Sequence, residues 1–363
     1  MKINFIDLQA QYRAYKDEID SEVLEVFSSA QFIGGEKLNS LEKNLATYTG
    51  AKHAIGCSSG TDALLLALMA LDVGAGDEVI TTPFTFIATA EVIALLGAKS
   101  VFIDINEDNY NIDAYKIEAA ITSKTKAIIP VSLYGQCADM DEINAIAKKH
   151  NITVIEDACQ SFGATYNGKK SCNLSTIACT SFFPSKPLGA YGDGGAIFTS
   201  DDELAAKMRM LLNHGQNERY KHKYIGINGR LDAVQAAILG VKLKHFENEV
   251  KLREEIGSRY SNLLEDAAVI TPKIKETNTS VYAQYSIRVK DREAMVAKLS
   301  ALGVPTAVHY PLPLHLQEAF AYLGYKEGDF PISELVSKEI MSLPMSAYLS
   351  EAEQDFVVQA IKG

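Results

Sequence analysis

The alternation that decides the fold is clearest in EVITTPFTFIATAEVIALLGAKSVFIDI, residues 78–105. An apolar segment at 78–82 is followed by a run with helical periodicity at 87–96 and by a second apolar segment at 100–103. The same alternation continues outward, with strands expected at 53–57, 127–131 and 152–155 and helices at 60–71, 114–121 and 140–150. Strands that are apolar throughout are typical of a parallel sheet covered by helices on both faces. The sequence therefore predicts an α/β fold.

The regions on either side of this alternation have different patterns. Two amphipathic helices are expected before it, at 6–29 and 38–48. After residue 158 we expect shorter strands near 162–166, 177–182 and 195–199, a helix at 201–213, a charged loop at 214–223 and a long helix from about 230 to 264. The remainder predicts one strand at 281–289 and helices at 291–302, 313–323 and 350–361. We therefore expect a large domain over 1–250 and a smaller α+β domain over 251–363.

Composition excludes several classes of protein. The 363 residues carry a net charge of −11, which argues against nonspecific nucleic-acid binding as the main function. No apolar run has the length of a signal peptide or of a membrane span. The scattered cysteines form no Cys-x-x-Cys pair, so we expect reduced thiols in a cytoplasmic protein and no metal site: Cys57, Cys137, Cys159, Cys172 and Cys179.

One lysine has an unusual setting. Lys186 lies between Pro184 and Pro187 in a segment with two phenylalanines, and glycines follow it. Pro187 pushes the residue before it away from helical backbone. Burial of an unpaired ammonium is costly, so this amine is expected to be neutral, paired or covalently modified. A surface lysine remains the alternative from this segment alone.

Three other segments fall where strands of the predicted sheet end, which is where ligands bind in open parallel sheets. Residues 57–63 combine small and hydroxyl side chains at a helix start, which suits either a phosphate or an ordinary helix cap. Residues 154–160 end a strand in two carboxylates, of which alternation turns one toward the site unless it only caps the next element. Residues 82–89 place an aromatic ring either against a planar ligand or in the core.

A phosphate site, a carboxylate, an aromatic ring and a special lysine together fit one ligand. Pyridoxal phosphate (PLP) has a phosphate, a ring nitrogen that requires an acidic partner and a carbonyl that bonds to a lysine. The acidic partner keeps the ring nitrogen protonated, so that the ring can accept electrons. The freed lysine can then act as a base.

These segments carry a family resemblance. The chain resembles the DegT family of sugar-nucleotide aminotransferases, which are fold type I PLP enzymes, from residues 5–8 through to 342–345. The motifs that carry it are 59–63, 156–163, 181–186, 192–195 and 228–232. The resemblance implies a mostly parallel seven-stranded sheet between helices, plus a smaller α+β C-terminal domain. Residues 130–139 and 303–311 are most similar to enzymes that aminate C3 of a UDP-linked 3-keto-N-acetylglucosaminuronic acid.

The resemblance also implies residue roles. Lys186 would bond covalently to the cofactor, Asp157 would pair with the pyridine nitrogen, and Gln160 would hydrogen-bond the ring hydroxyl. Phe86 would lie against the ring. The residues implied to hold the phosphate are Gly60, Thr61, Ser181 and, from the neighbouring subunit, Asn228. Those implied to bind the sugar nucleotide are Ser185, His309, Tyr310, Arg230 from the partner, and Ala30 and Phe32, where relatives have glycine and tyrosine. A homodimer with shared sites is therefore expected.

The predicted reaction moves an amino group from L-glutamate to C3 of the UDP-linked 3-keto sugar. Its product would be UDP-2-acetamido-3-amino-2,3-dideoxyglucuronate, a precursor of surface polysaccharide such as the O-antigen of lipopolysaccharide. One alternative keeps this chemistry on a 4-keto or dTDP-linked sugar. A sugar dehydratase of the same fold would have histidine in place of Lys186, so the lysine argues against that reading. A PLP-binding regulatory protein without turnover is the alternative that is not an enzyme.

Overall fold

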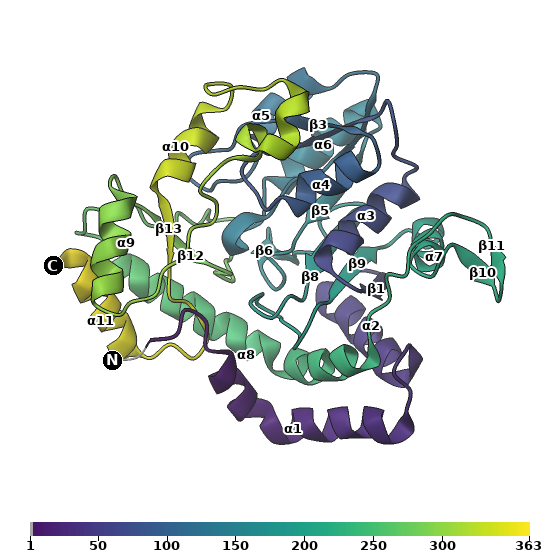
Figure 1. The fold of residues 1–363 in the computed structure, drawn as a ribbon, viewed down its shortest axis with the longest axis horizontal. Coiled ribbons are helices and arrows are strands. Elements are labelled where there is room, and N and C mark those ends of the chain that lie inside the picture. The colour runs from purple at the N-terminus through teal and green to yellow at the C-terminus, as the bar shows by residue number, and fades with distance from the viewer. Residues whose placement is uncertain (1–2) are drawn as a thin grey trace.

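A seven-stranded sheet forms the centre of the computed structural model, which describes residues 3–363 (Figure 1). The strand order is β1-β9-β8-β5-β4-β2-β3, and β9 is antiparallel to both of its neighbours whereas the other pairs are parallel. The strands are β1 (His53–Cys57), β2 (Glu78–Thr81), β3 (Lys99–Phe102), β4 (Thr125–Ile128), β5 (Thr153–Asp157), β8 (Ile177–Ser181) and β9 (Gly195–Thr199). This confirms the predicted fold class.

Side-chain alternation buries both faces of the sheet. Ile155 of β5 belongs to an apolar cluster with α3 (Gly60–Ala70), α4 (Ala88–Leu95) and α7 (Asp202–Leu211). Its neighbour Val154 belongs to the cluster on the opposite face. The helices of that opposite face are α2 (Gly35–Thr49), α5 (Ala114–Ile117), α6 (Met140–His150) and the first half of α8 (Ala233–Leu263). Because successive residues of a strand point to opposite faces, the uninterrupted apolar runs in the sequence predicted this arrangement.

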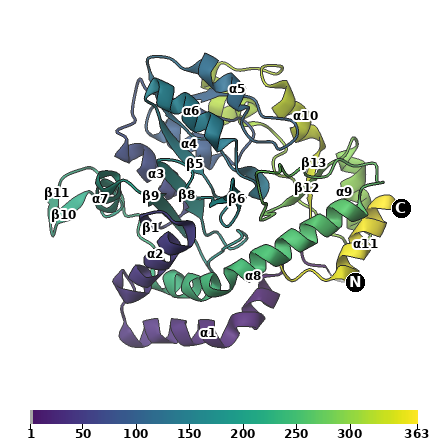
Figure 2. The ribbon, with the colours of Figure 1, turned by 180° about the vertical axis from the view of Figure 1, so that it is seen from behind.

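The long helix α8 joins this sheet to the C-terminal part of the chain (Figure 2). Its 31 residues are unbroken, and α1 (Leu8–Ser29) packs along it. Phe246 and Val250 lie in the cluster beside the sheet, whereas Ile256 and Tyr260 belong to the C-terminal cluster. The C-terminal elements are β12 (Tyr285–Arg288), α9 (Arg292–Ala301), α10 (Pro331–Glu339), β13 (Ile340–Leu343) and α11 (Glu351–Lys362). The predicted division at residue 250 falls inside α8 and stays a prediction.

The smaller elements depart from the sequence-based expectation in several places. The charged loop contains a hairpin of β10 (Gln216–Glu218) and β11 (Lys221–His222), and the segment near 162–166 contributes only β6 (Thr165–Tyr166), which pairs with β7 (Lys169–Lys170). The helix expected at 313–323 is two 3₁₀ segments, Leu314–Leu316 and Glu318–Leu323, because Gln317 between them has extended backbone.

The C-terminal strand is also shorter than expected. The strand expected at 281–289 begins only at Tyr285, because Tyr282 has a positive φ and Val281 donates its N–H to the carbonyl of Gly135. Its antiparallel partner β13, together with α10, was not predicted at all. No helix within residues 3–363 combines the length and the hydrophobicity needed to cross a membrane.

Candidate active site

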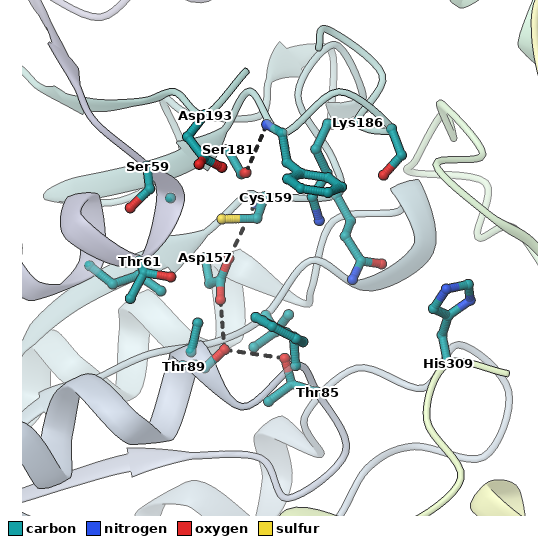
Figure 3. A pocket seen from close by; sticks show the side chains of 18 of the residues that line it. Ser59, Thr61, Thr85, Thr89, Asp157, Cys159, Ser181, Lys186, Asp193 and His309 are labelled. Carbon is teal, nitrogen blue, oxygen red and sulfur yellow. Dashed lines mark hydrogen bonds between the residues drawn. The ribbon is translucent and has the colours of Figure 1, made fainter. Parts of the chain in front are cut away.

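A cavity of about 450 Å³ opens at the carboxyl ends of the strands (Figure 3). The residues that end β5 and β8 line it, as do the segments that follow β1, β2 and β4. The predicted site residues that line this cavity are Gly60, Thr61, Phe86, Asp157, Gln160, Ser181, Ser185, Lys186, His309 and Tyr310. The fold therefore brings together predicted site residues that lie up to two hundred and fifty positions apart in the sequence, counted from Gly60 to Tyr310.

Lys186 lies on a loop between β8 and β9 whose ends are joined. The N–H of Phe182 donates to the carbonyl of Gly194 (2.7 Å), and the N–H of Lys186 donates to the carbonyl of Phe183 (2.8 Å). A Cβ at Gly189 would lie 2.4 Å from the carbonyl oxygen of Pro184, so the turn after Lys186 requires a glycine. The glycines around this lysine thus allow a tight loop, whereas the sequence predicted only that Lys186 is not in a helix.

Lys242 of α8 holds the same loop, and this role was not predicted from the sequence. This lysine is buried on α8, donates a hydrogen bond to the carbonyl of Gly189 and lies 4.5 Å from the centre of the Tyr191 ring. Burial lowers the pKa of Lys242 to about 8. The available signal was a lysine at a position where the apolar stripe of a helix continues.

Asp157 ends β5 with its carboxylate turned into the cavity. One oxygen accepts a hydrogen bond from the hydroxyl of Thr89 (2.8 Å) and the other accepts one from the N–H of Cys159 (3.2 Å). The Thr89 hydroxyl in turn lies 3.2 Å from that of Thr85, and both threonines are buried. Both donors to Asp157 are neutral, and no ion pair within residues 3–363 involves it. A buried carboxylate in this state is suited to a cationic group of a ligand.

Glu156, its neighbour, points to the other face of the sheet. Its carboxylate accepts hydrogen bonds from the hydroxyls of Ser171 (2.8 Å) and Ser132 (3.2 Å) and from the N–H of Cys172 (3.0 Å). Burial raises the pKa of Glu156 to about 7. Strand alternation therefore divides the two predicted carboxylates, with Asp157 in the site and Glu156 in the core.

Replacement of Glu156 by glutamine is expected to stabilise the protein at alkaline pH. A carboxyl group whose pKa is raised from 4.5 to about 7 contributes stability below its unfolded pKa and loses it as the pH rises through its folded pKa. A glutamine can satisfy the same three groups without that loss. We expect E156Q to gain about 3 kcal/mol over the wild type at about pH 8 and little at about pH 5. Urea unfolding at both pH values measures this, and a gain that does not vary with pH would contradict it.

Gln160 is held so that its amino group faces the cavity. Its Oε1 accepts a hydrogen bond from the N–H of Tyr134 (2.8 Å), and its Nε2 donates to the hydroxyl of Tyr310 (3.2 Å). Because the oxygen is already engaged by a backbone donor, the amide orientation is fixed. Gln160 can therefore donate a further hydrogen bond to an oxygen of a ligand, as its predicted role requires.

His309 lies at the opposite end of the cavity from Ser59 and Thr61 (Figure 3). Its Nδ1 lies 3.0 Å from the hydroxyl of Ser342, and burial together with the charge of Lys186 lowers the pKa of His309. The imidazole is thus neutral near pH 7, and its second nitrogen remains for a ligand.

The end of the cavity near Ser59 is built on the N-terminus of α3. Ser59 caps the helix by accepting from the N–H of Asp62 (3.0 Å), and the first helical backbone bond runs from Ala63 to the Ser59 carbonyl. The amides of Gly60 and Thr61 precede that bond, so they are free of helical partners. A Cβ at Gly60 would lie 2.7 Å from the Cβ of Ser181. The cap and the anion site, posed as alternatives from the sequence, are therefore compatible.

Four predicted residues do not line the cavity of their own chain: Ala30, Phe32, Asn228 and Arg230. They lie near one another, because Ile33 forms a bridge with Asp232. Arg230 donates to Asn213 (2.6 Å) and does not open a helix as expected, because its backbone pairs with Cys57 and α8 begins only at Ala233. Other residues that line the cavity have no role predicted from the sequence, among them Thr85, Thr89, Asp193 and Gln284.

The geometry fits the cofactor predicted from the sequence. Asp157 offers an unpaired carboxylate to a ring nitrogen, Gln160 offers a donor to a ring hydroxyl, and the amides at the start of α3 suit a phosphate. Phe86 lines the cavity with 53% of its surface exposed, whereas Phe84 is fully buried in the core. Of the two aromatic residues, Phe86 is thus available to a planar ring.

Replacement of Thr89 by valine is expected to weaken cofactor binding roughly tenfold, because a hydrogen bond to a charged group contributes about 1.5 kcal/mol. Valine keeps the shape of the side chain and removes the hydroxyl, which donates to Asp157 and contacts the Thr85 hydroxyl. The dissociation constant of the cofactor, followed by its absorption, measures this, and Thr89→Ser should restore the wild-type value. A loss of affinity in Thr89→Ser but not in Thr89→Val would show that the methyl group, and not the hydroxyl, matters.

Comparisons with known proteins show the family of this chain. The model of the DegT/DnrJ/EryC1/StrS aminotransferase family matches residues 13–362. A Pseudomonas aeruginosa protein named UDP-2-acetamido-2-deoxy-3-oxo-D-glucuronate aminotransferase is 55% identical, over 99% of each chain. A Geobacillus stearothermophilus protein named pleiotropic regulatory protein is 51% identical, over 99% of this chain and 98% of that one. The crystal structure of NtdA from Bacillus subtilis, with bound cofactor PMP, superposes with a TM-score of 0.92 at 33% identity, over 99% of this chain and 84% of that one. The chain therefore belongs to the DegT/DnrJ/EryC1/StrS aminotransferase family.

Proposed function

We propose that this aminotransferase uses PLP to move an amino group from L-glutamate to C3 of a UDP-linked 3-keto-N-acetylglucosaminuronic acid. The observation that carries the chemistry is the cavity in which Lys186, Asp157 and Gln160 converge. The observation that favours this sugar is the 55% identity with the P. aeruginosa enzyme over nearly the whole of both chains. A role in the synthesis of surface polysaccharide and a cytoplasmic location stay predictions.

Each residue of the cavity has its own role in this reaction. Bound PLP supplies a carbonyl carbon that takes up the amine and a ring that accepts electrons. Asp157 holds a proton on the ring nitrogen, and Thr89 keeps its carboxylate oriented. The Lys186 amine, once it is not bonded to the cofactor, can remove a proton from the carbon of the amine donor that bears the nitrogen. It can later return a proton to the sugar carbon that receives the nitrogen. Gln160 donates to the ring hydroxyl, while the start of α3 holds the phosphate.

The sugar would lie between Lys186 and His309. Ser185 and Tyr310 line this part of the cavity, and the neutral His309 can donate to or accept from a sugar oxygen. The substrate carries a diphosphate and a carboxylate, for which a guanidinium is the best bidentate partner. Arg230 would supply it from a second subunit.

We further propose that the active form is a homodimer with shared sites. Ala30, Phe32, Asn228 and Arg230 lie outside the cavity of their own chain but beside it, since the N–H of Ser58 donates to the carbonyl of Gly229 (2.8 Å). Three apolar side chains near the same surface are about half exposed: Phe27, Phe32 and Ile33. The ring centres of Phe27 and Phe32 lie 6.2 Å apart. Clustered exposed apolar side chains of this kind are typical of an interface.

Mixing inactive variants tests the shared site. Chains with K186A and chains with R230A are each expected to lack turnover. In a randomly mixed population, about a quarter of all sites would combine an intact Lys186 with an intact Arg230 from the partner. Recovery of about a quarter of the wild-type activity supports the shared site, and no recovery in dimers proven to be mixed contradicts it. Light scattering establishes the oligomeric state of each sample.

A panel of keto sugar nucleotides tests the reaction itself. The purified protein, loaded with PLP, should transfer nitrogen from glutamate to the UDP-linked 3-keto uronate faster than to 4-keto or dTDP-linked sugars. Turnover of one of those alternatives alone would reassign the substrate. The relative named as a regulatory protein makes a non-catalytic role the second candidate. In that case the yellow colour of the bound cofactor would not change when glutamate is added.

A further inference from the structure

We propose that Tyr134 is a positioning residue, which fixes the substrate-binding segment 308–310 relative to the cofactor-facing amide of Gln160. The assignment of that segment to the substrate rests on the proposed function. Residues 130–139 carried part of the resemblance to the 3-keto-sugar enzymes, and of Tyr134 only the backbone N–H has had a role so far, as the donor to Gln160.

Tyr134 donates two hydrogen bonds, one from its backbone and one from its side chain. Its backbone N–H donates to the Oε1 of Gln160 (2.8 Å), and its hydroxyl donates to the carbonyl oxygen of His309. Burial raises the pKa of Tyr134 well above its usual value, so the hydroxyl keeps its proton and remains a donor. One residue thereby holds both the group that faces the cofactor and the backbone that carries His309 and Tyr310.

The backbone of Tyr134 is in a conformation that a tyrosine rarely adopts. Its φ of 56° lies in the left-handed region, in a short turn at Leu133–Gly135 that leaves the sheet after β4. Such a backbone is costly and persists where the surroundings determine it. Here the N–H of Leu133 donates to Asn111 (2.9 Å), and a Cβ at Gly135 would lie 2.6 Å from the nitrogen of Tyr282. The residues on either side of Tyr134, Leu133 and Gly135, are therefore both held in place by their neighbours.

Packing carries the effect from the turn to the substrate segment. Tyr134 belongs to an apolar cluster that joins the strand ends, through Phe84 and Val131, to the C-terminal part of the chain. Val308 and Tyr310 pack against this cluster. Loss of the hydroxyl should therefore loosen the carbonyl of His309 without disturbing the cluster, because phenylalanine fills the same space.

Tyr134→Phe removes the hydrogen bond of the hydroxyl and keeps that of the backbone N–H. The backbone N–H to Gln160 survives, so the absorption of the bound cofactor and its reaction with glutamate should match those of the wild type. The KM for the keto sugar should rise roughly fivefold, as expected for the loss of one buried neutral hydrogen bond. Tyr260→Phe is the matched control, since its hydroxyl is buried, donates to the carbonyl of Pro344 (3.2 Å) and lies outside the cavity.

Hydrogen exchange of the PLP-loaded protein tests the same inference without a substrate. Amides in a peptide that covers 305–311 should exchange several times faster in Y134F than in the wild type or in Y260F. Unchanged exchange there would overturn the inference, and so would a loss of cofactor retention that accompanies the rise in KM. If the wild type does not use the sugar, the proposed function fails, and the exchange result still decides whether Tyr134 holds the segment.

Discussion

Replacement of Lys186 by alanine is expected to abolish transamination and to leave the fold intact. The side chain lies in the cavity, whereas the loop is held by backbone hydrogen bonds and by the side chains of Ser181, Gln235 and Lys242. Removal of the Lys186 side chain therefore breaks none of the hydrogen bonds that hold the loop. The variant loses the only lysine amine that lines the cavity within residues 3–363, and with it both the proposed covalent bond to the cofactor and the proposed base. We expect turnover to fall by at least about a thousandfold.

Two measurements distinguish this from a folding defect. Treatment of the wild type with borohydride should leave the cofactor permanently attached to the peptide that contains Lys186, whereas K186A should release it on unfolding. The matched control is Lys99→Ala, because Lys99 is more than half exposed and remote from the cavity. Residual activity of K186A within tenfold of the wild type would refute the assignment of Lys186.

Replacement of Asp157 by asparagine is expected to cause the second large loss, roughly a hundred- to a thousandfold in kcat. Asparagine can keep the acceptor for the N–H of Cys159, and its amino group can donate to the Thr89 hydroxyl, so the local structure should survive. The neutral amide, however, cannot hold a proton on the ring nitrogen. The ring then accepts electrons poorly, and the proton at the substrate carbon becomes harder to remove.

Glu156→Gln is the matched control for this variant. It makes the same chemical change one residue earlier, on the side chain that points to the opposite face of the sheet. Steady-state kinetics and the pH titration of the cofactor absorption should change in D157N and not in E156Q. An equal loss of kcat in both variants would show that the strand end, and not the carboxylate in the cavity, is what matters.

The sheet and its two helical layers could be predicted because they depend on local periodicity. The apolar runs at β2 and β3 and the helical run between them are strong signals over short segments. The elements that the sequence did not reveal depend on distant partners. β13 becomes a strand because β12 lies beside it, and β12 begins late because Gly135 binds Val281, which is 146 residues away along the chain.

The residues of the candidate site also fall into those that local sequence reveals and those that depend on distant partners. Lys186, Asp157 and Gln160 could be found because each stands in a motif, and the structure places all three in one cavity. Thr89, Tyr134 and Lys242 support the site through tertiary contacts. Nothing in the local sequence distinguishes Thr89 and Tyr134 from core positions, and the signal at Lys242 is only a lysine within the apolar stripe of a helix. Asn228 and Arg230 do not line the cavity of their own chain, so that a single chain cannot test their roles.

The joined ends of the loop that carries Lys186 limit how the amine can travel. Because Phe182 is tied to Gly194 and Gly189 to Lys242, the segment cannot swing open to carry its lysine toward or away from a ligand. All of the travel has to come from rotation about the bonds of the flexible four-carbon side chain. The length of the lysine stem therefore sets the working radius of the amine, and a residue with a shorter stem could not be rescued by movement of the loop.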